Sequence, residues 1–469
     1  MISPTRAIRY YLNPEGCPGT RPLMEDFAPS TQAIHKAIDG AIRKHGIPYL
    51  HPDGPTLQLD MLGSHNMINW QESKAAWGFT GEQCWSDLPQ FYARYGMETT
   101  RALLAKVRSM ENASGAILTD CGMQAVALTF DALASRAGHA VLLRGVYNKV
   151  PTYLEWLAKR LQIEITTVDH GAYEAIEKAI RPETFLIFGE TYSNPLTRAI
   201  DPVRLGRMAL EARKRQAKGL FLVIDNTVAT PWGVPQPFLD YDGVDVVVAS
   251  GTKALAGQDR DLWGHIVSNR TDFLNEVMDL EAMRGGTLDW RRAEAILKDL
   301  DLAKKRFRNR CRSATEIARF LARHPKVESV YHPSLPEHPD RAVIDRFYSL
   351  PGSLLAFKIR GADEGQTRHF ADVLATSIIL RYAGSFDGLT TKINHHRTVS
   401  EYFTPDEVQK KAGVDRTLRL AAGLEAPEDI MACLNWAFWH YQEISEKEVQ
   451  NWQQARREEL GIGRTTERG

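Results

Sequence analysis

One lysine stands directly after an apolar run, among small polar residues. A Val-Val-Val-Ala run ends at Ala249 and is followed by Ser250, Gly251, Thr252 and then Lys253. This pattern predicts a buried strand that ends in a turn with available hydroxyl and N–H groups. A lysine there is either a solvated loop residue or an amine held to form a Schiff base with a carbonyl compound. The rest of the chain has to decide between these interpretations.

An aspartate ends the preceding apolar run, Phe-Leu-Val-Ile-Asp, at Asp225. It lies one strand-and-crossover unit before Lys253, so both side chains can reach the same crevice of a parallel sheet. A carboxylate at a strand end is as often a helix cap or a solvated loop acid. Beside a Schiff-base lysine it has a specific use. Pyridoxal phosphate withdraws electrons only while its ring nitrogen is protonated, and a buried aspartate secures that proton.

A phosphate group needs its own donors. Cys-Gly-Met at 121–123 ends one apolar run and opens a helical pattern, which directs free N–H groups and the positive helix end toward an anion. Ser250 and Thr252 add hydroxyl donors. A glycine at a helix start is by itself more often a plain turn. Its position in the chain ahead of Asp225 and Lys253 gives it more weight.

These residues lie where strands alternate with helices, which predicts a mainly parallel sheet covered on both faces. The predicted strands are 115–118, 140–143, 163–168, 185–188, 221–224, 244–248 and 265–267, with helical patterns at 101–110, 124–134 and between most strands. After about residue 302 the pattern predicts a smaller α+β domain. Its predicted helices are 303–323, 363–375 and 426–443, and its predicted strands are 327–331, 353–359 and 417–421.

The chain divides into three predicted segments. Residues 1–90, rich in proline, glycine and aromatics, have the composition of an arm that packs on a neighbouring subunit, although a floppy tail would look the same. Residues 91–302 form the predicted large domain, and residues 303–469 the C-terminal domain. The strongly charged stretch 446–469 is expected to end frayed.

Composition narrows the function classes. Lysine plus arginine and aspartate plus glutamate number 58 each, so no net charge favours nucleic acid or a membrane surface. The five cysteines are scattered without metal-ligand spacing, which predicts reduced thiols and no metal site. No signal peptide and no run long enough to cross a bilayer are recognisable, so we expect a cytoplasmic protein.

The motifs resemble the Cys/Met-metabolism family of pyridoxal 5'-phosphate (PLP) enzymes, the transsulfuration group with cystathionine γ-synthase, cystathionine lyases, methionine γ-lyase and O-acylhomoserine sulfhydrylases. The resemblance covers about residues 91–438. It rests on Asp-Asn-Thr at 225–227, Ser-x-Thr-Lys at 250–253 and Glu-Thr-x-Ser-Asn-Pro at 190–195. It implies an α/β protein of fold type I, similar to aspartate aminotransferase, with a mainly parallel large-domain sheet and a smaller α+β C-terminal domain.

The resemblance also implies residue roles. Lys253 would be the Schiff-base lysine and the base that moves protons, and Asp225 the partner of the ring nitrogen. Tyr147 would stack on the cofactor and assist the leaving group, although a tyrosine after a strand is usually packing. Further cofactor contacts are implied at Gly122, Met123, Asn194, Thr227, Ser250 and Thr252.

Two residues point to a partner subunit. Tyr92 and Arg94 match a Tyr-x-Arg pair that binds the phosphate of the adjacent subunit's cofactor, although a loop arginine is commonly solvated. The match implies a site that is complete only in a dimer. Because the family is commonly a dimer of dimers, we expect a homotetramer.

The substrate side combines matches with departures. Arg419 matches a carboxylate clamp and Asn194 a residue that contacts both cofactor and carboxylate, although a strand arginine can also be a structural ion pair. Tyr382 aligns with a serine that helps to orient the substrate. The segments 94–99, 147–153, 256–264 and 381–389 differ from the usual family patterns. These departures leave the cofactor chemistry intact and put the substrate in question.

The predicted reaction is elimination from a β- or γ-substituted L-amino acid, with Tyr147 as the acid. The preferred substrate is γ-substituted and derived from homoserine or homocysteine, and the products are a keto acid and ammonia. The alternatives are a γ-replacement enzyme of the cystathionine γ-synthase or O-acylhomoserine sulfhydrylase type, and a non-catalytic family member.

Overall fold

The computed structural model describes residues 98–134, 137–215, 219–377, 379–400, 405–412 and 414–461. The chain divides into two compact units, Met1–Ala102 and Leu103–Gly469. The architecture below is that of the second unit. The predicted N-terminal arm, with Tyr92 and Arg94, lies outside the described residues.

A seven-stranded sheet forms the larger part of this unit, in the order β1-β7-β6-β5-β4-β2-β3. Its strands are β1 (Gly115–Thr119), β2 (His139–Leu143), β3 (Glu164–Val168), β4 (Thr184–Glu190), β5 (Phe221–Asp225), β6 (Val246–Ala249) and β7 (Gly264–Ser268). The strands from β3 to β6 are parallel, while β7 is antiparallel to both β6 and β1. The prediction of a mainly parallel sheet is therefore confirmed.

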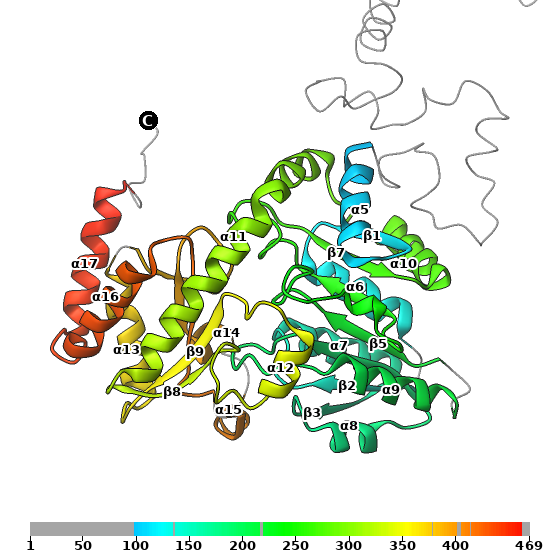
Figure 1. Cartoon of the computed structure of the whole chain (residues 1–469), viewed down its shortest axis with the longest axis horizontal. Helices are drawn as coiled ribbons and strands as arrows, with labels where there is room; N and C mark the ends of the chain where they lie inside the picture. Colours follow the sequence, from blue (N-terminus) through cyan, green and yellow to red (C-terminus); the bar gives the residue numbers. More distant parts are fainter. Residues whose placement is uncertain are drawn as a thin grey trace, which may run out of the picture. The chain divides into compact units, whose positions relative to one another are not determined.

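Helices connect these strands (Figure 1). They are α5 (Glu98–Glu111), α6 (Gly122–Leu133), α7 (Lys149–Leu161), α8 (Tyr173–Ala179), α9 (Pro202–Arg213) and α10 (Thr271–Arg284). Helix α6 packs against α7 and α10, whereas α8 packs against α9. With right-handed crossovers and this strand order, the two groups cover opposite faces of the sheet. The carboxyl ends of the parallel strands are left free to carry a site.

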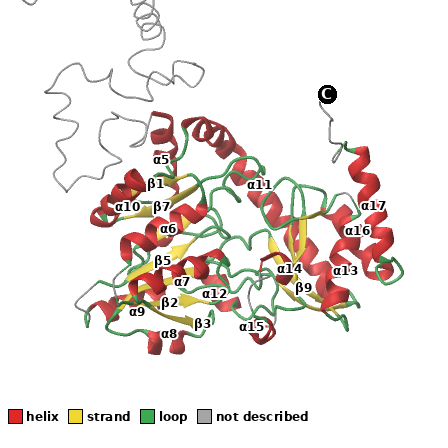
Figure 2. Cartoon of the chain, turned by 180° about the vertical axis from the view of Figure 1, so that it is seen from behind, coloured by secondary structure: helices red, strands yellow, loops and turns green. Residues whose placement is uncertain are grey.

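A second sheet has the order β10-β11-β12-β9-β8. Figure 2 shows its strands among the C-terminal helices. The elements are β8 (Val327–Tyr331), β9 (Leu354–Ile359), β10 (Arg381–Tyr382), β11 (Lys392–His395), β12 (Leu418–Ala421), α12 (Arg341–Phe347), α13 (Glu364–Ala375), α14 (His396–Ser400), α15 (Asp406–Ala412), α16 (Pro427–His440) and α17 (Glu446–Glu459). Leu355, Ile393 and Leu420 lie side by side across it and belong to the core shared with α13 and α16.

One helix of 34 residues, α11 (Trp290–Arg323), runs between the two sheets (Figures 1 and 2). Buried residues recur along it at helical spacing, as at Ile296, Leu300 and Phe307, and Asp289 caps its start. Helix α11 begins well before the predicted start at residue 303. Helix α11 therefore lies beside both sheets.

Most of the charged stretch 446–469 forms a helix, α17 (Glu446–Glu459), and the end that was expected to be frayed lies outside the described residues. Ser445 and Glu448 form a capping box at the start of this helix, a signal legible in the sequence. Among the described residues, no helix has the length and apolar character needed to cross a membrane.

Candidate active site

Lys253 follows β6, as the apolar run before it predicts. Its Nζ donates a hydrogen bond of 2.8 Å to Ser385 Oγ. Burial lowers the pKa of the Lys253 amine to about 8, with repulsion from Arg419 as the next cause. A substantial share of the amine is therefore neutral near physiological pH, as a nucleophile or base requires.

Asp225 ends β5 in the neighbouring position of the sheet. Its Oδ1 accepts a hydrogen bond of 2.9 Å from Thr227 N. Burial raises the pKa of the Asp225 carboxyl to about 6. In the described part of the chain, no basic side chain lies within ion-pair distance of this carboxyl. It is thus a buried acid suited to a cationic or proton-bearing ligand atom.

Glu190 is a site residue to which the sequence motif gave no role. It ends β4 directly opposite Asp225 in the sheet register, and its Oε1 accepts a hydrogen bond from Tyr147 N. Burial, and then the Asp225 charge, raise the pKa of Glu190 well above its ordinary value. The Glu190 carboxyl therefore holds its proton more tightly than a solvated glutamate does.

The predicted phosphate donors come from two loops in close contact. Gly122 opens α6, and a Cβ built on it would lie 2.5 Å from Ser250 Cβ, so only glycine allows this approach. Ser250 N donates to Thr227 Oγ1 over 2.8 Å. Met123 is the second residue of the same helix. The start of α6 and the loop after β6 thus form one surface, and the N–H groups of a helix start are suited to hold an anion there.

Thr252 is engaged differently. Its hydroxyl accepts a hydrogen bond of 3.0 Å from Trp263 N and donates one of 3.2 Å to Trp263 O. These bonds fix the loop after β6 to the start of β7. They also hold Ser250 and Lys253 on either side of Thr252 in place.

Tyr147 and Asn194 lie on adjacent loops. Asn194 N donates to Gly145 O over 2.7 Å, two residues before Tyr147. Tyr147 is 44 % exposed. The Asn194 side chain is buried and faces Arg419.

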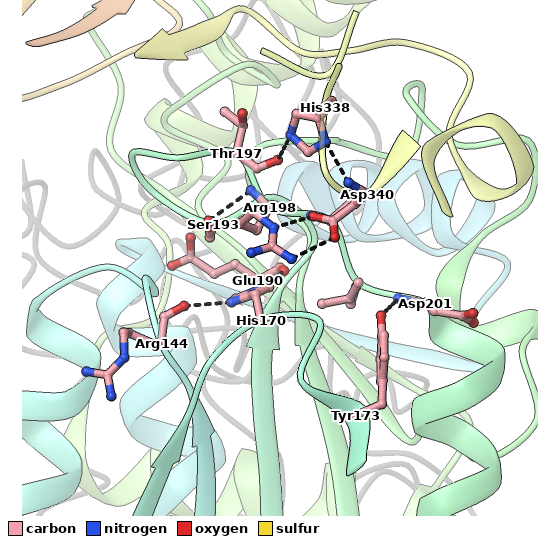
Figure 3. Close-up of polar contacts among 12 residues, drawn as sticks. Arg144, His170, Tyr173, Glu190, Ser193, Thr197, Arg198, Asp201, His338 and Asp340 are labelled. Carbon is pink, nitrogen blue, oxygen red and sulfur yellow. Dashed lines mark hydrogen bonds and ion pairs between the residues drawn. The ribbon is translucent and has the colours of Figure 1, made fainter. Parts of the chain in front are cut away.

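A polar network supports both loops (Figure 3). The buried His170 ring contacts Arg144 O at 2.6 Å and Glu190 O at 3.1 Å, so it joins the ends of β2 and β4. Arg198 donates from two nitrogens to Asp340, over 2.6 and 2.8 Å. This pair ties the Asn194 loop to the segment before α12.

Arg419 lies on β12 and is 2 % exposed. Its Nη1 donates to Asn194 Oδ1 over 3.3 Å, and its Nη2 to Gly384 O over 2.5 Å and Ser385 O over 3.4 Å. Burial lowers the pKa of Arg419 to about 10, so the guanidinium stays charged. Among the described residues no carboxylate pairs with it, which argues against a structural ion pair and leaves a docking point for an anion.

The structure does not bring Tyr382 to these residues. Tyr382 pairs with Ile393, which pairs with Leu420, and both partners face the helix-covered core. Because side chains alternate along a strand, Arg419 lies on the opposite face of this sheet. The predicted substrate contact of Tyr382 is therefore not supported. Ser385, the other hydroxyl residue of the same segment, contacts Lys253 instead.

The arrangement fits pyridoxal phosphate. It offers a partly neutral lysine amine, a buried carboxyl at the next strand end, an anion-binding helix start and a buried guanidinium. The cofactor would be held by Lys253, Asp225, Gly122 and Ser250. Within the described residues, no cluster of three or more His, Cys, Asp or Glu side chains is placed to hold a metal.

Comparison with known proteins gives matches over most of the chain. Residues 75–439 match the family model described as Cys/Met metabolism PLP-dependent enzyme. O-succinylhomoserine sulfhydrylase of Pseudomonas aeruginosa is 32 % identical over 73 % of this chain and 81 % of that protein. L-methionine gamma-lyase of Fusobacterium nucleatum is 29 % identical over 73 % of this chain and 84 % of that protein.

A solved structure agrees with the fold. Cystathionine gamma synthase from Xanthomonas oryzae pv. oryzae, in complex with aminoacrylate and cysteine, matches with a TM-score of 0.68 and 26 % identity, over 75 % of this chain and 88 % of that one. The fold is therefore that of fold-type I PLP enzymes. The chain belongs to the Cys/Met metabolism family of PLP-dependent enzymes, whose members are carbon–sulfur lyases and transsulfuration enzymes.

Proposed function

We propose that this enzyme eliminates the γ substituent of an L-amino acid derived from homoserine or homocysteine, and releases a keto acid and ammonia. One observation carries the proposal: Lys253 and Arg419 both bond to Ser385, and Arg419 has no carboxylate partner among the described residues. A base for an α-proton therefore stands beside a receptor for an α-carboxylate. An α-amino acid has both groups.

Each step of the proposed reaction is assigned to particular residues of this chain. Arg419 and Asn194 hold the substrate carboxylate, and Lys253 takes the α-proton and carries it to the next carbon. Bound pyridoxal phosphate supplies the electron sink for the charge that develops at the α-carbon. Asp225 keeps the proton on the ring nitrogen of that cofactor. Tyr147, exposed at the end of its loop, donates a proton to the departing heteroatom.

Replacement at the γ carbon is the second candidate. The names of two relatives, O-succinylhomoserine sulfhydrylase and cystathionine gamma-synthase, favour it. Both candidates share the steps up to departure of the substituent. They differ in whether a thiol or water completes the reaction.

The test is a panel of amino acids, comprising cystathionine, methionine, cysteine, canavanine and O-acyl homoserines, each assayed for keto acid and ammonia with and without an added thiol. Keto acid without thiol is expected from at least one γ-substituted compound. A thioether product formed only with thiol would favour replacement. Lys253→Ala serves as the inactive control. Release from β-substituted compounds alone would refute γ-elimination.

We further propose a cytoplasmic homotetramer built from active dimers, in which Tyr92 and Arg94 serve the neighbouring subunit's cofactor phosphate. Arg94→Ala and Lys253→Ala should each be inactive. Mixed in equal amounts and allowed to exchange subunits, they should regain about a quarter of wild-type activity, since hybrid dimers have one intact site. No regain on mixing, with native mass spectrometry of one variant carrying a mass tag as proof of exchange, would refute the shared site.

A further inference from the structure

A buried arginine connects the two loops that meet at Lys253. We name residues 254–260 the lysine loop and residues 383–391 the serine loop. Arg310, fully buried in the middle of α11, donates from Nη2 to Ala254 O over 3.4 Å and from Nη1 to Gly257 O over 3.3 Å. The same Nη1 lies 3.3 Å from Gly388 O. One guanidinium therefore holds both loops.

The serine loop carries an acidic residue that pairs with Arg310. Asp387 is buried, and its Oδ1 lies 3.6 Å from Arg310 Nε. Ser353 Oγ donates a hydrogen bond to the same carboxylate oxygen. Asp387 is two residues after Ser385 in the same loop, so the contacts of Asp387 anchor the loop close to Ser385.

A second ion pair joins the two loops, with its acid on the lysine loop and its base directly after the serine loop. Lys392 directly follows the serine loop, is buried, and pairs through Nζ with Asp259 Oδ1 at 2.6 Å. Asp259 Oδ2 also accepts a hydrogen bond of 3.3 Å from Leu389 N. A Cβ built on Gly388 would lie 1.7 Å from Asp259 Oδ2 and 2.0 Å from Lys392 Nζ. The two loops are thus closely packed at this point.

Buried ion pairs contribute little stability compared with apolar packing, because removing charges from water costs about as much as their attraction returns. Arg310–Asp387 is such a buried pair, while Lys392–Asp259 joins a buried lysine to an exposed aspartate. Together with the Arg310 hydrogen bonds to Ala254 O and Gly257 O, the two pairs connect the lysine loop with the serine loop, which calls for a role in positioning. Their joint effect is to fix the distance between Lys253 on one side and Ser385 on the other.

We propose that the ion pairs Arg310–Asp387 and Lys392–Asp259 form a clamp that holds the serine loop on the lysine loop and so positions Ser385 at the Lys253 amine. The inference rests on the proposed role of Lys253 as the base. Ser385 accepts a hydrogen bond from the amine and sets its direction while it moves protons between substrate carbons. The clamp residues are positioning residues, since none of them contacts Lys253 in the structure.

Charge reversal tests the clamp. In Asp259→Lys and in Lys392→Asp, like charges meet, the serine loop shifts, and kcat should fall about 10- to 100-fold in both, with KM changed less than about threefold. The exchange variant with both substitutions should recover to within about threefold of wild-type kcat. Glu328→Lys, at a more exposed ion pair of the same sheet, is the control and should have no effect.

The single variants separate positioning from a general effect of charge. Asp259 favours and Lys392 disfavours the charged form of Lys253. The pH midpoint of the bound cofactor's absorbance should therefore fall in Asp259→Lys and rise in Lys392→Asp. If charge alone mattered, kcat at a fixed pH would move in opposite directions in the two variants. Loss of kcat in both, with recovery in the exchange, supports the clamp.

Three results would overturn the proposal: wild-type kcat in both single variants, opposite changes of kcat, or no recovery in the exchange variant with an unchanged melting temperature. If the exchange variant fails to fold, Ser385→Ala provides the test. Adding Lys392→Asp to Ser385→Ala should then lower kcat no further than Ser385→Ala alone. A wild-type protein that binds the cofactor but acts on no amino acid defeats the proposed function. In that case the clamp is tested by the pH midpoint of the bound cofactor's absorbance, which Arg310→Lys and Ser385→Ala should shift equally.

Discussion

Gly122→Ala tests the anion-binding surface directly. The new Cβ would lie 2.5 Å from Ser250 Cβ and 2.8 Å from Ser250 Cα, about 1 Å inside normal contact. Ser250 would have to move, and overpacking of this kind costs about 1–3 kcal/mol. The cost falls on the geometry that binds the phosphate. Since about 1.4 kcal/mol is a factor of ten in affinity, cofactor binding should weaken about 5- to 150-fold.

The assay is a spectrophotometric titration of cofactor-free protein with pyridoxal phosphate. The matched control is Gly365→Ala, since Gly365 also lies in the first turn of a helix, α13, and its Cβ would meet only Asp363 Oδ1 at 3.4 Å. Gly365→Ala should bind the cofactor like the wild type. If Gly122→Ala does so as well, the start of α6 does not bind the phosphate and the reasoning fails.

Three further predictions concern single side chains. Arg419→Lys keeps the charge but loses the planar fork, so kcat/KM for the amino acid should fall about 10- to 150-fold, the loss of about 1.5–3 kcal/mol, with unchanged cofactor affinity; an equal loss of cofactor affinity would contradict the assignment. Asp225→Asn should stabilise the cofactor-free protein. In the folded protein the pKa of Asp225 is about 6, above the ordinary value of 3.8. Wild-type protein therefore has its full stability against unfolding below about pH 4, and loses part of it as the pH rises to 6. The advantage of asparagine should grow over this window to about 3 kcal/mol in urea unfolding and then stay constant; an advantage independent of pH would refute it. In the cofactor-free protein, the reaction of Lys253 with an amine reagent should have a pH midpoint near the Lys253 pKa of about 8, against about 10.4 for solvated lysines. Mass spectrometry of the peptide that contains Lys253 measures this midpoint, and a value equal to that of the other lysines would disprove the prediction.

Apolar runs made the large sheet predictable. Residues 246–249 and 221–224 are buried on both faces, so their sequences are almost continuously apolar and end abruptly at polar residues. Because parallel strands end at the same edge, the positions of Asp225 and Lys253 along the chain were enough to predict that they share a crevice. The two motifs at these ends also carried the family resemblance.

The serine loop was not predictable in the same way. Its strand β10 has two residues, too few for an alternating pattern to show which side chains face the core. The alignment of family motifs therefore placed the family's substrate-orienting serine at Tyr382, and Ser385 was not considered. Only the pairing of Tyr382 with Ile393 reveals that its side chain lies on the far face.

Buried ionisable side chains escaped prediction for a different reason. Arg310 occupies the apolar stripe of α11 between Phe307 and Ala314, where a charged residue reads as an interruption of the pattern. Glu190 follows an apolar run and reads as a solvated strand end. Their partners, Asp387 and Asp225, come from distant segments, so the sequence offers no local signal for either pairing.

The place of β7 in the large sheet has a consequence for the growing chain on the ribosome. Among the seven described strands of the large sheet, β1 pairs with β7, which lies between β1 and β6 although it is the last of the seven strands to be synthesised. Gly122 therefore cannot settle against Ser250 until residues 264–268 have emerged and paired. Domains fold as their sequence becomes available, so capture of the cofactor would mark the completion of this sheet during synthesis.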